Sequence, residues 1–389
     1  MTGRTMHETD PTDTTDTVRV TDTTDTVRVT DTTDTVRAAD VIGTAGATTE
    51  TLSGTEGATA GKAASGTAAM RGEVRAPDAT GAGARLLRAA AVAATLPYLA
   101  LKTAWLAGSD IGIPEGSVLL DPGVFFTVAN AVTMAMDAAV IVLALLLTRP
   151  WGRRVPAPLL LVPAFTATGL LTPILAGFPA QLALRAVGLG ADPAARAAGE
   201  SFLDGWVYLV VYGGFTVQGL ALTGLFVPYA RRRWGSVWQG ASGVRLPSPT
   251  GVAAGAAAAL GTALGVLYAY WAFGGTAGLG AERAALHSAE TGVVSAVHAV
   301  CALLAGWCAV LLARGGARRP VRPLVAGWTG SAATLCWGLY LLVAALAPQT
   351  GEGGSTPAVI LLAYGGQVVT GCLAAAVLTA FATRRRIPA

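Results

Sequence analysis

Eight long apolar segments, separated by short polar connections, constrain the fold of this chain more than any other feature. An α-helix rises about 1.5 Å per residue, so about 20 apolar residues cross the hydrocarbon layer of a bilayer. The sequence therefore predicts an all-α fold, a polytopic membrane bundle of eight transmembrane helices. The predicted spans are 87–108, 124–148, 157–177, 203–229, 251–274, 291–313, 323–347 and 357–382.

The composition agrees with a membrane protein. Of the 389 residues, 53% are hydrophobic and only 13% are charged,. Arginine dominates the basic residues, as codon bias in a GC-rich genome produces, so the net charge of +4 does not indicate a nucleic-acid partner. The four cysteines lie in apolar segments outside any CxxC or Cys/His cluster, so we predict no disulfide, metal site or cofactor,. The lipid bilayer is the predicted partner.

The arginines indicate how the spans are oriented. On one side of the predicted membrane the connections contain only Arg185, Arg196 and Arg283. The connections and chain ends on the other side contain sixteen arginines: Arg85, Arg88, Arg149, Arg153, Arg154, Arg231, Arg232, Arg233, Arg245, Arg314, Arg318, Arg319, Arg322, Arg384, Arg385 and Arg386. Because positively charged connections are retained in the cytoplasm, we predict a plasma-membrane protein with both termini inside.

Residues 1–84 form a polar segment before the first span. It contains TDTTDTVRV from Thr12 and again from Thr21, followed by TDTTDTVRA from Thr30. A segment of this composition buries too little apolar surface to offset its ordering entropy, which predicts a disordered cytoplasmic tail. A solvated tail is favoured over a repeat that binds a partner or accepts modification. Translation starting near Met70 is the other alternative, and it would remove the repeat.

The spans show signs of an internal duplication. Residues 130–154 match 295–319 at a shift of 165, and Trp105 matches Trp271 at a shift of 166,. The fourth and eighth spans share a YGG motif that starts at Tyr212 and Tyr364. Two tandem four-helix units in parallel orientation explain these matches, although alanine-rich helices also match by chance. The predicted units are 85–233 and 251–389, joined by a cytoplasmic linker at 234–250.

Five polar side chains within the predicted spans form a candidate intramembrane site: Lys102, Asp137, Gln218, His298 and Gln367. Lys102 lies roughly 10 Å from the outer boundary, so reaching the headgroups is favoured over a solute-binding role or a pair with Asp137. Asp137 lies near mid-span and needs a partner or a proton. A satisfied core imidazole is favoured for His298 over a proton relay. Packing is the default for both glutamines, and a polar cavity is the alternative.

Three stretches resemble a group of multi-pass membrane proteins of actinobacteria for which no activity is established. They are LPYLALKTAWLAG from Leu96, TRPWGRRVPAPLLLVPAFTATGLL from Thr148 and VYGGFTVQG from Val211. The resemblance covers most of residues 86–386 and implies an actinobacterial plasma-membrane protein without assigning a catalytic residue. A further stretch, PAQLALRAVG from Pro179, is amphipathic and predicts a short helix lying flat on the outer leaflet,.

The sequence lacks the GxxxxGK[ST], GxSxG and HExxH motifs, so an enzyme or ATP-driven pump is not favoured,. The favoured function is a transporter or exporter of a small solute, with Asp137, Lys102 and His298 lining a path between the units. The alternative is a non-transporting scaffold, anchor or sensor, and an intramembrane enzyme acting on a lipid-linked substrate ranks third. A polar cleft containing Asp137 between the units would favour transport, and a closed core would favour a scaffold.

Overall fold

The computed structural model describes residues 79–120, 124–190, 202–238, 245–315, 319–346 and 356–386. Eight helices in these ranges are long and apolar enough to cross a membrane. Each overlaps one predicted span, so the predicted all-α, eight-helix fold is confirmed. The helices are α2 (Ala79–Leu106), α3 (Val124–Thr148), α4 (Ala157–Ala186), α6 (Gly205–Arg233), α8 (Ser248–Ala272), α10 (Ala289–Arg314), α11 (Val321–Leu346) and α12 (Ala358–Arg386).

Four short helices lie in the described parts of the connections. They are η1 (Val118–Leu120), η2 (Pro150–Arg154), α7 (Gly235–Trp238) and α9 (Ala281–Ala285). Residues 79–84, which the sequence assigned to the tail, belong to α2, because the alanine-rich stretch before the apolar run continues the helix,. The rest of the predicted tail, with its repeats, lies outside the described residues.

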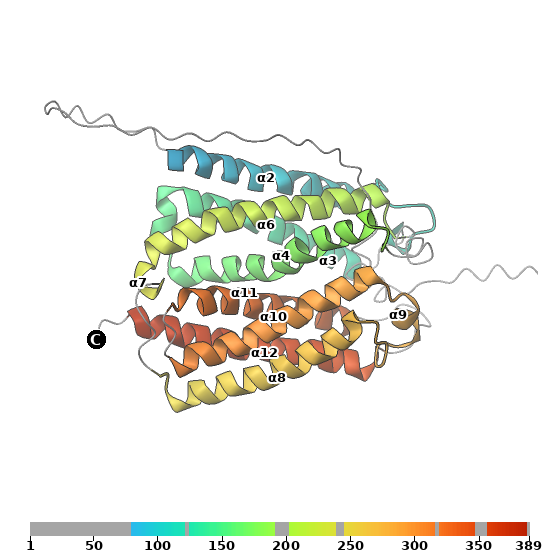
Figure 1. Cartoon of the computed structure of the whole chain (residues 1–389). Coiled ribbons are helices and arrows are strands. Elements are labelled where there is room, and N and C mark those ends of the chain that lie inside the picture. The colour runs from blue at the N-terminus through green and yellow to red at the C-terminus, as the bar shows by residue number, and fades with distance from the viewer. Residues whose placement is uncertain are drawn as a thin grey trace, which may run out of the picture.

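The long helices form two groups that lie side by side (Figure 1). We call α2, α3, α4 and α6 the first unit, and α8, α10, α11 and α12 the second unit. In each unit the first helix packs against the second and the fourth: α2 contacts α3 and α6, and α8 contacts α10 and α12. Helix α4 also packs against α10 and α11, and this contact joins the units.

The contact between the units is close. A Cβ atom on Gly169 of α4 would lie 2.4 Å from the carbonyl oxygen of Ala332 in α11, so only glycine lets the two backbones approach this far,. Two indoles of α11 donate hydrogen bonds to α4. Trp337 Nε1 donates to the Leu170 carbonyl at 3.1 Å, and Trp328 Nε1 donates to Thr168 Oγ1 at 3.2 Å. Backbone and indole groups therefore fill this part of the interface.

The predicted interfacial helix at Pro179 is wrong, because α4 continues through this residue to Ala186. Gln181 is buried, and its Nε2 donates to the Glu290 carbonyl of α10 at 3.1 Å. Arg185 binds the Glu290 carboxylate through two hydrogen bonds, Nε to Oε1 at 2.8 Å and Nη2 to Oε2 at 2.7 Å. The Gln181 amide nitrogen and the Arg185 guanidinium group therefore bind the second unit instead of the headgroups,.

The turns after α2 and α8 repeat one arrangement. Trp105 Nε1 donates to the Ile111 carbonyl at 2.8 Å, and Trp271 Nε1 donates to the Ala277 carbonyl at 3.0 Å. Both indoles thus reach a carbonyl six residues onward, and the two bonds are 166 residues apart. Four glycines at the same spacing have positive φ, which other residues adopt rarely. They are Gly108 and Gly112 after α2, and Gly274 and Gly278 after α8.

The opposite end of the bundle collects the arginine-rich connections. Arg233, at the end of α6, donates to the carbonyls of Gly152 at 3.2 Å and Val155 at 2.5 Å, which ties α6 to the turn between α3 and α4. Arg385 near the end of α12 donates to the Val237 carbonyl of α7 at 3.2 Å. In Figure 1 this end carries α7 and the C-terminus, whereas α9 lies at the other end.

Candidate functional site

Lys102 and Asp137 form an ion pair between α2 and α3. The Lys102 Nζ lies 2.8 Å from Asp137 Oδ2, and the lysine side chain is completely buried. Tyr98, one helical turn before Lys102, places its ring centroid 3.8 Å from the same Nζ,. The favoured prediction that Lys102 reaches the headgroups is therefore wrong, and the alternative pair with Asp137 is confirmed. A carboxylate within reach satisfies the ammonium group without a path to water.

A second polar contact of the first unit joins α6 to α2. Gln218 Nε2 donates to Thr95 Oγ1 at 2.8 Å, and Thr95 Oγ1 in turn donates to the Ala91 carbonyl at 2.8 Å. Both side chains are buried. Hydrogen bonds of this kind hold transmembrane helices together, with an average value of about 0.6 kcal/mol.

His298 and Gln367 meet in the second unit, between α10 and α12. Gln367 Nε2 lies 3.2 Å from His298 Nδ1, and both residues are buried. The imidazole is enclosed by two aromatic rings. Tyr268 of α8 stacks on it with centroids 5.3 Å apart, and Trp337 of α11 meets it edge-on at 5.9 Å. All four helices of the second unit thus contribute to the surroundings of His298.

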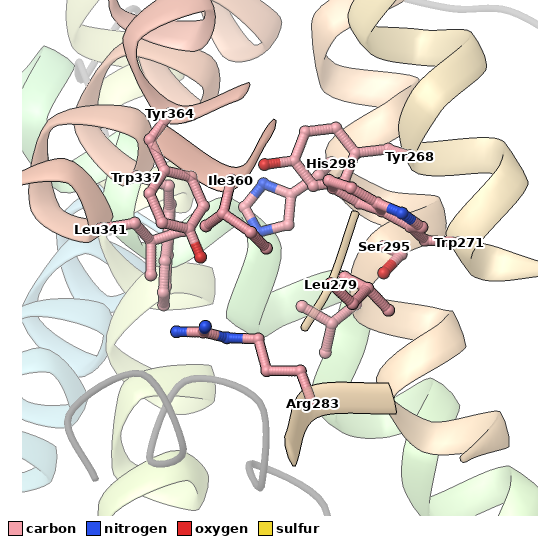
Figure 2. Close-up of a pocket in the computed structure, with 11 residues that line it drawn as sticks. Tyr268, Trp271, Leu279, Arg283, Ser295, His298, Trp337, Leu341, Ile360 and Tyr364 are labelled. Atoms are coloured by element: carbon pink, nitrogen blue, oxygen red, sulfur yellow. The ribbon is translucent and has the colours of Figure 1, made fainter. Parts of the chain in front are cut away.

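A cavity of about 50 Å³ lies beside His298 at the α9 end of the second unit. Figure 2 shows aromatic rings, the imidazole and the Arg283 side chain around this space. Among the described residues of the lining, Arg283 carries the one full positive charge and none is acidic. The cavity is lined by Tyr268, Trp271, Leu279, Arg283, Val294, Ser295, His298, Trp337, Leu341, Ile360 and Tyr364.

Buried polar atoms continue from this cavity toward the middle of the bundle. Gln367 Oε1, Thr334 Oγ1 and Thr370 Oγ1 have no hydrogen-bond partner among the described residues. Thr334 lies one turn further from the α9 end than Trp337, and Thr370 lies one turn further than Gln367,. Buried polar groups without protein partners are sites where ordered water is expected. We call Gln367, Thr334 and Thr370 the polar track, because their unpartnered atoms lie on helix turns next to residues of the cavity or further inward.

The five residues predicted as one site make three separate contacts. Lys102 with Asp137 and Gln218 with Thr95 lie within the first unit, whereas His298 with Gln367 lies within the second. These contacts do not form a common path between the units. Aromatic side chains lie between the two units instead. The phenol groups of Tyr98 of α2, Tyr212 of α6 and Tyr340 of α11 are close enough to interact electrostatically.

Sequence reasoning missed most of the cavity residues. Some of them could have been found by looking one helical turn toward the α9 end from each polar residue already singled out. Ser295 lies three residues before His298, and Tyr364 lies three residues before Gln367, so each shares a helix face with a polar residue already singled out,. Arg283 had no such signal, because it belongs to the connection that contains α9.

The chemistry available at this site is binding through hydrogen bonds, charge and aromatic contact. Within the described ranges, no three His, Cys, Asp or Glu side chains lie together in a way that could hold a metal ion. Comparisons of the chain with protein-family models, with curated proteins and with solved structures found no match.

Proposed function

We propose that this multi-pass membrane protein is a carrier or exporter of a small solute, and that the solute passes through the second unit. The observation that carries the proposal is the cavity beside His298 together with the polar track beyond it. Ion and solute pathways are where membrane proteins retain buried polar groups that have no structural partner. The paired groups of the first unit support the fold and are not part of this path.

The proposal includes an orientation in the plasma membrane. The connections at the end that carries α7 are rich in arginine, and positive connections favour the cytoplasm,. Both termini then lie in the cytoplasm, and the α9 end faces outward. The cavity is therefore the outer part of the path, and Thr334 and Thr370 belong to its inner part.

A tandem duplication is part of the same proposal. The matching turns after α2 and α8 support it. In each turn an indole donates to the carbonyl six residues onward, and the two acceptors, Ile111 and Ala277, have the same spacing as the two tryptophans. The equivalent packing of α2 and α8 against their neighbours agrees with it. Four helices per unit give both units the same orientation.

A non-transporting scaffold is the second candidate. Two observations favour it: the contact between the units, and the burial of Asp137 in an ion pair within the first unit instead of in a cleft between the units. The close approach at Gly169 and the two indole hydrogen bonds from α11 to α4 leave the units tightly joined. Carriers that rock one half against the other need an interface that can separate. A scaffold has no such need.

Cysteine accessibility distinguishes the two candidates without knowledge of the solute. In a chain whose four native cysteines are replaced by alanine, Ser295→Cys and Thr370→Cys are treated with a membrane-impermeant maleimide in intact cells and in inside-out vesicles. For a carrier, Ser295→Cys reacts from the outside and Thr370→Cys reacts from the cytoplasmic side, because the path opens to each side in turn.

The matched control is Val369→Cys, because Val369 precedes Thr370 and is 49% exposed on the lipid-facing surface. It remains unreactive from both sides, since a maleimide in water does not reach hydrocarbon. If Thr370→Cys behaves like this control, the track is closed and the scaffold is the better function.

A further inference from the structure

Three buried oxygen atoms of the second unit have no hydrogen-bond partner among the described residues. They are Gln367 Oε1 and Thr370 Oγ1 of α12, and Thr334 Oγ1 of α11. All three side chains are no more than 1% exposed. A polar group that is buried without a partner is unfavourable unless water or a ligand binds it. The polar track therefore offers hydrogen bonds that the fold itself does not use.

Two glycines show that the polar track lies along the contact of α11 with α12. A Cβ atom on Gly338 would lie 2.6 Å from Gln367 Cβ, and one on Gly371 would lie 2.6 Å from Leu335 Cβ. The two threonines of the track adjoin this second contact in the sequence, which places their hydroxyl groups at the same level of the bundle. Gln367 lies one turn nearer the α9 end,.

His298 supplies a hydrogen-bond donor beside these oxygen atoms. Its Nδ1 lies 3.2 Å from Gln367 Nε2. A neutral imidazole whose Nδ1 accepts this amide hydrogen carries its own hydrogen on Nε2. Ser295 lies three residues nearer the α9 end on α10, and both residues line the cavity (Figure 2). The groups available to a ligand are thus hydroxyl groups, an amide oxygen and an imidazole N–H, and all of them are uncharged.

The charged side chains near the cavity already have partners. Arg283 has an interaction within the protein, and Glu290 binds Arg185 through both carboxylate oxygens. None of the described lining residues is acidic. An ion inside the membrane needs a countercharge, and these residues offer none for either sign of charge. The ligand that fits this part of the second unit is therefore uncharged.

The walls and the size of the cavity restrict the rest of the ligand. Trp271 Nε1 donates to the Ala277 carbonyl at 3.0 Å, and Trp337 Nε1 donates to the Leu170 carbonyl at 3.1 Å. Because both N–H groups are used, the two rings offer apolar surface, which suits the C–H groups of a ligand. A water-sized group needs about 10–15 Å³, so a cavity of about 50 Å³ holds roughly three to five of them,. A ligand with two or three carbon atoms fits this space.

We infer that the second unit binds a short-chain uncharged polyol, with its C–H groups against the two indole rings and its hydroxyl groups on Ser295 and His298. A hydroxyl group both donates and accepts, so it matches an imidazole donor, an amide acceptor and other hydroxyl groups. The inference rests on the proposed function, because it names the class of solute that the carrier takes. The cavity is the outer binding site, and the polar track binds the hydroxyl groups of the solute further inward.

The test is ligand binding to the purified full-length chain in lipid nanodiscs, measured by calorimetry and by the change in tryptophan fluorescence. The probes are glycerol, glycerate and serinol, which share a three-carbon skeleton but are neutral, negative and positive at neutral pH. Glycerol binds, and each charged analogue binds at least about tenfold more weakly, because its charge has no countercharge in the site.

Two variants locate the hydroxyl groups that hold the solute. Ser295→Ala removes one from the cavity, so glycerol binds at least about fivefold more weakly. Thr334→Val removes an unpartnered one from the polar track, so glycerol uptake into proteoliposomes slows at least about fivefold,. Its denaturant midpoint stays the same or rises, because no hydrogen bond within the protein is lost. The matched control is Thr262→Val, because the Thr262 hydroxyl group donates to the Ala258 carbonyl at 2.7 Å and does not line the cavity. This control keeps both the affinity and the rate.

Three results would overturn the inference. They are equal binding of glycerol and its charged analogues, an unchanged affinity in Ser295→Ala with an unchanged uptake in Thr334→Val, or no glycerol binding, which leaves water as the occupant. Failure of this inference is separable from failure of the carrier function. Absence of glycerol binding together with a reactive Thr370→Cys refutes the ligand class and leaves the carrier. Glycerol binding with an unreactive Thr370→Cys supports the site and refutes the carrier.

Discussion

The two four-helix units solve the same packing problem with different chemistry. The first unit buries an ammonium group and a carboxylate against each other between α2 and α3. At the corresponding positions the second unit has Tyr268 and Ala302, which need no ionic partner. A buried ion pair fills its site and is costly to open, whereas a neutral aromatic layer leaves space that a ligand can enter. Under the proposed function, the first unit is the support and the second unit holds the path of the solute.

Neighbouring helices within each unit also approach each other to different extents. In the second unit a Cβ atom on Gly261 would meet the Ala302 carbonyl at 2.5 Å, and one on Gly306 would meet the Ala257 carbonyl at 2.6 Å. Small residues therefore bring α8 and α10 into direct backbone contact. In the first unit Thr95 and Ile141 stand at the corresponding positions. Helices α2 and α3 contact each other less extensively than α8 and α10 do, and the Thr95 hydroxyl is bonded to Gln218 of α6.

The largest effect is expected from breaking the ion pair. Asp137→Asn leaves the Lys102 ammonium group buried without a countercharge, so the free energy of unfolding should fall by about 3–5 kcal/mol. The measurement is denaturant unfolding in detergent micelles, followed by circular dichroism. The cavity beside His298 lies in the other unit, so the maleimide reactivity of Ser295→Cys should be unchanged at a temperature where the variant is folded.

A double variant separates charge from packing in this experiment. Lys102→Met with Asp137→Leu replaces both charged groups by apolar ones of similar size, and most of the lost stability should return. If the double variant is as unstable as the single one, the loss of stability comes from the shape of the side chains and not from their charge. The contrast between the units then has no electrostatic basis.

The contrast in packing gives a smaller effect. Gly306→Ala places a methyl group against backbone atoms of Ala257 and Ala258, so we expect a destabilisation of about 1–3 kcal/mol,. Gly213→Ala in the first unit is the matched control, because no atom lies within 4 Å of its added Cβ. This change should be neutral or stabilising by up to about 1 kcal/mol, since alanine favours the helix. Equal losses in the same unfolding assay would contradict the difference in packing.

The sequence was sufficient to predict the helices, because hydrophobic length alone determines which segments can span a bilayer. The sequence predicted less well which residue of a neighbouring helix a given side chain contacts. Lys102 shows this limit: its depth is compatible with the headgroups, and only the position of Asp137 on the neighbouring helix decides otherwise. The stretch at Pro179 shows the same limit, since its partner Glu290 lies more than a hundred residues away.

The candidate site was predicted only in part for a related reason. Polar residues within apolar spans are conspicuous, so His298 and Gln367 could be singled out from the sequence. Trp271 and Trp337 are ordinary residues of apolar helices, and nothing in their local sequence separates a cavity wall from a packed core. Grouping the five polar residues into one site required knowledge of which helices are neighbours, and the units keep them apart.

The smallest expected effect tests whether the two units are equivalent at all. Trp105→Phe and Trp271→Phe each remove one indole hydrogen bond to a carbonyl six residues onward, which should cost about 0.5–1.5 kcal/mol in either unit,. Because Trp271 is buried and Trp105 is only half-buried, Trp271→Phe should cost more stability in denaturant unfolding than Trp105→Phe, and in the double variant the two losses should add,. Of the two indoles only Trp271 lines the cavity, so only its substitution should also change the maleimide reactivity of Ser295→Cys. Additive losses of stability, together with a change in reactivity for Trp271→Phe alone, would mean that two turns of the same construction have separate roles, one in the fold and one at the cavity.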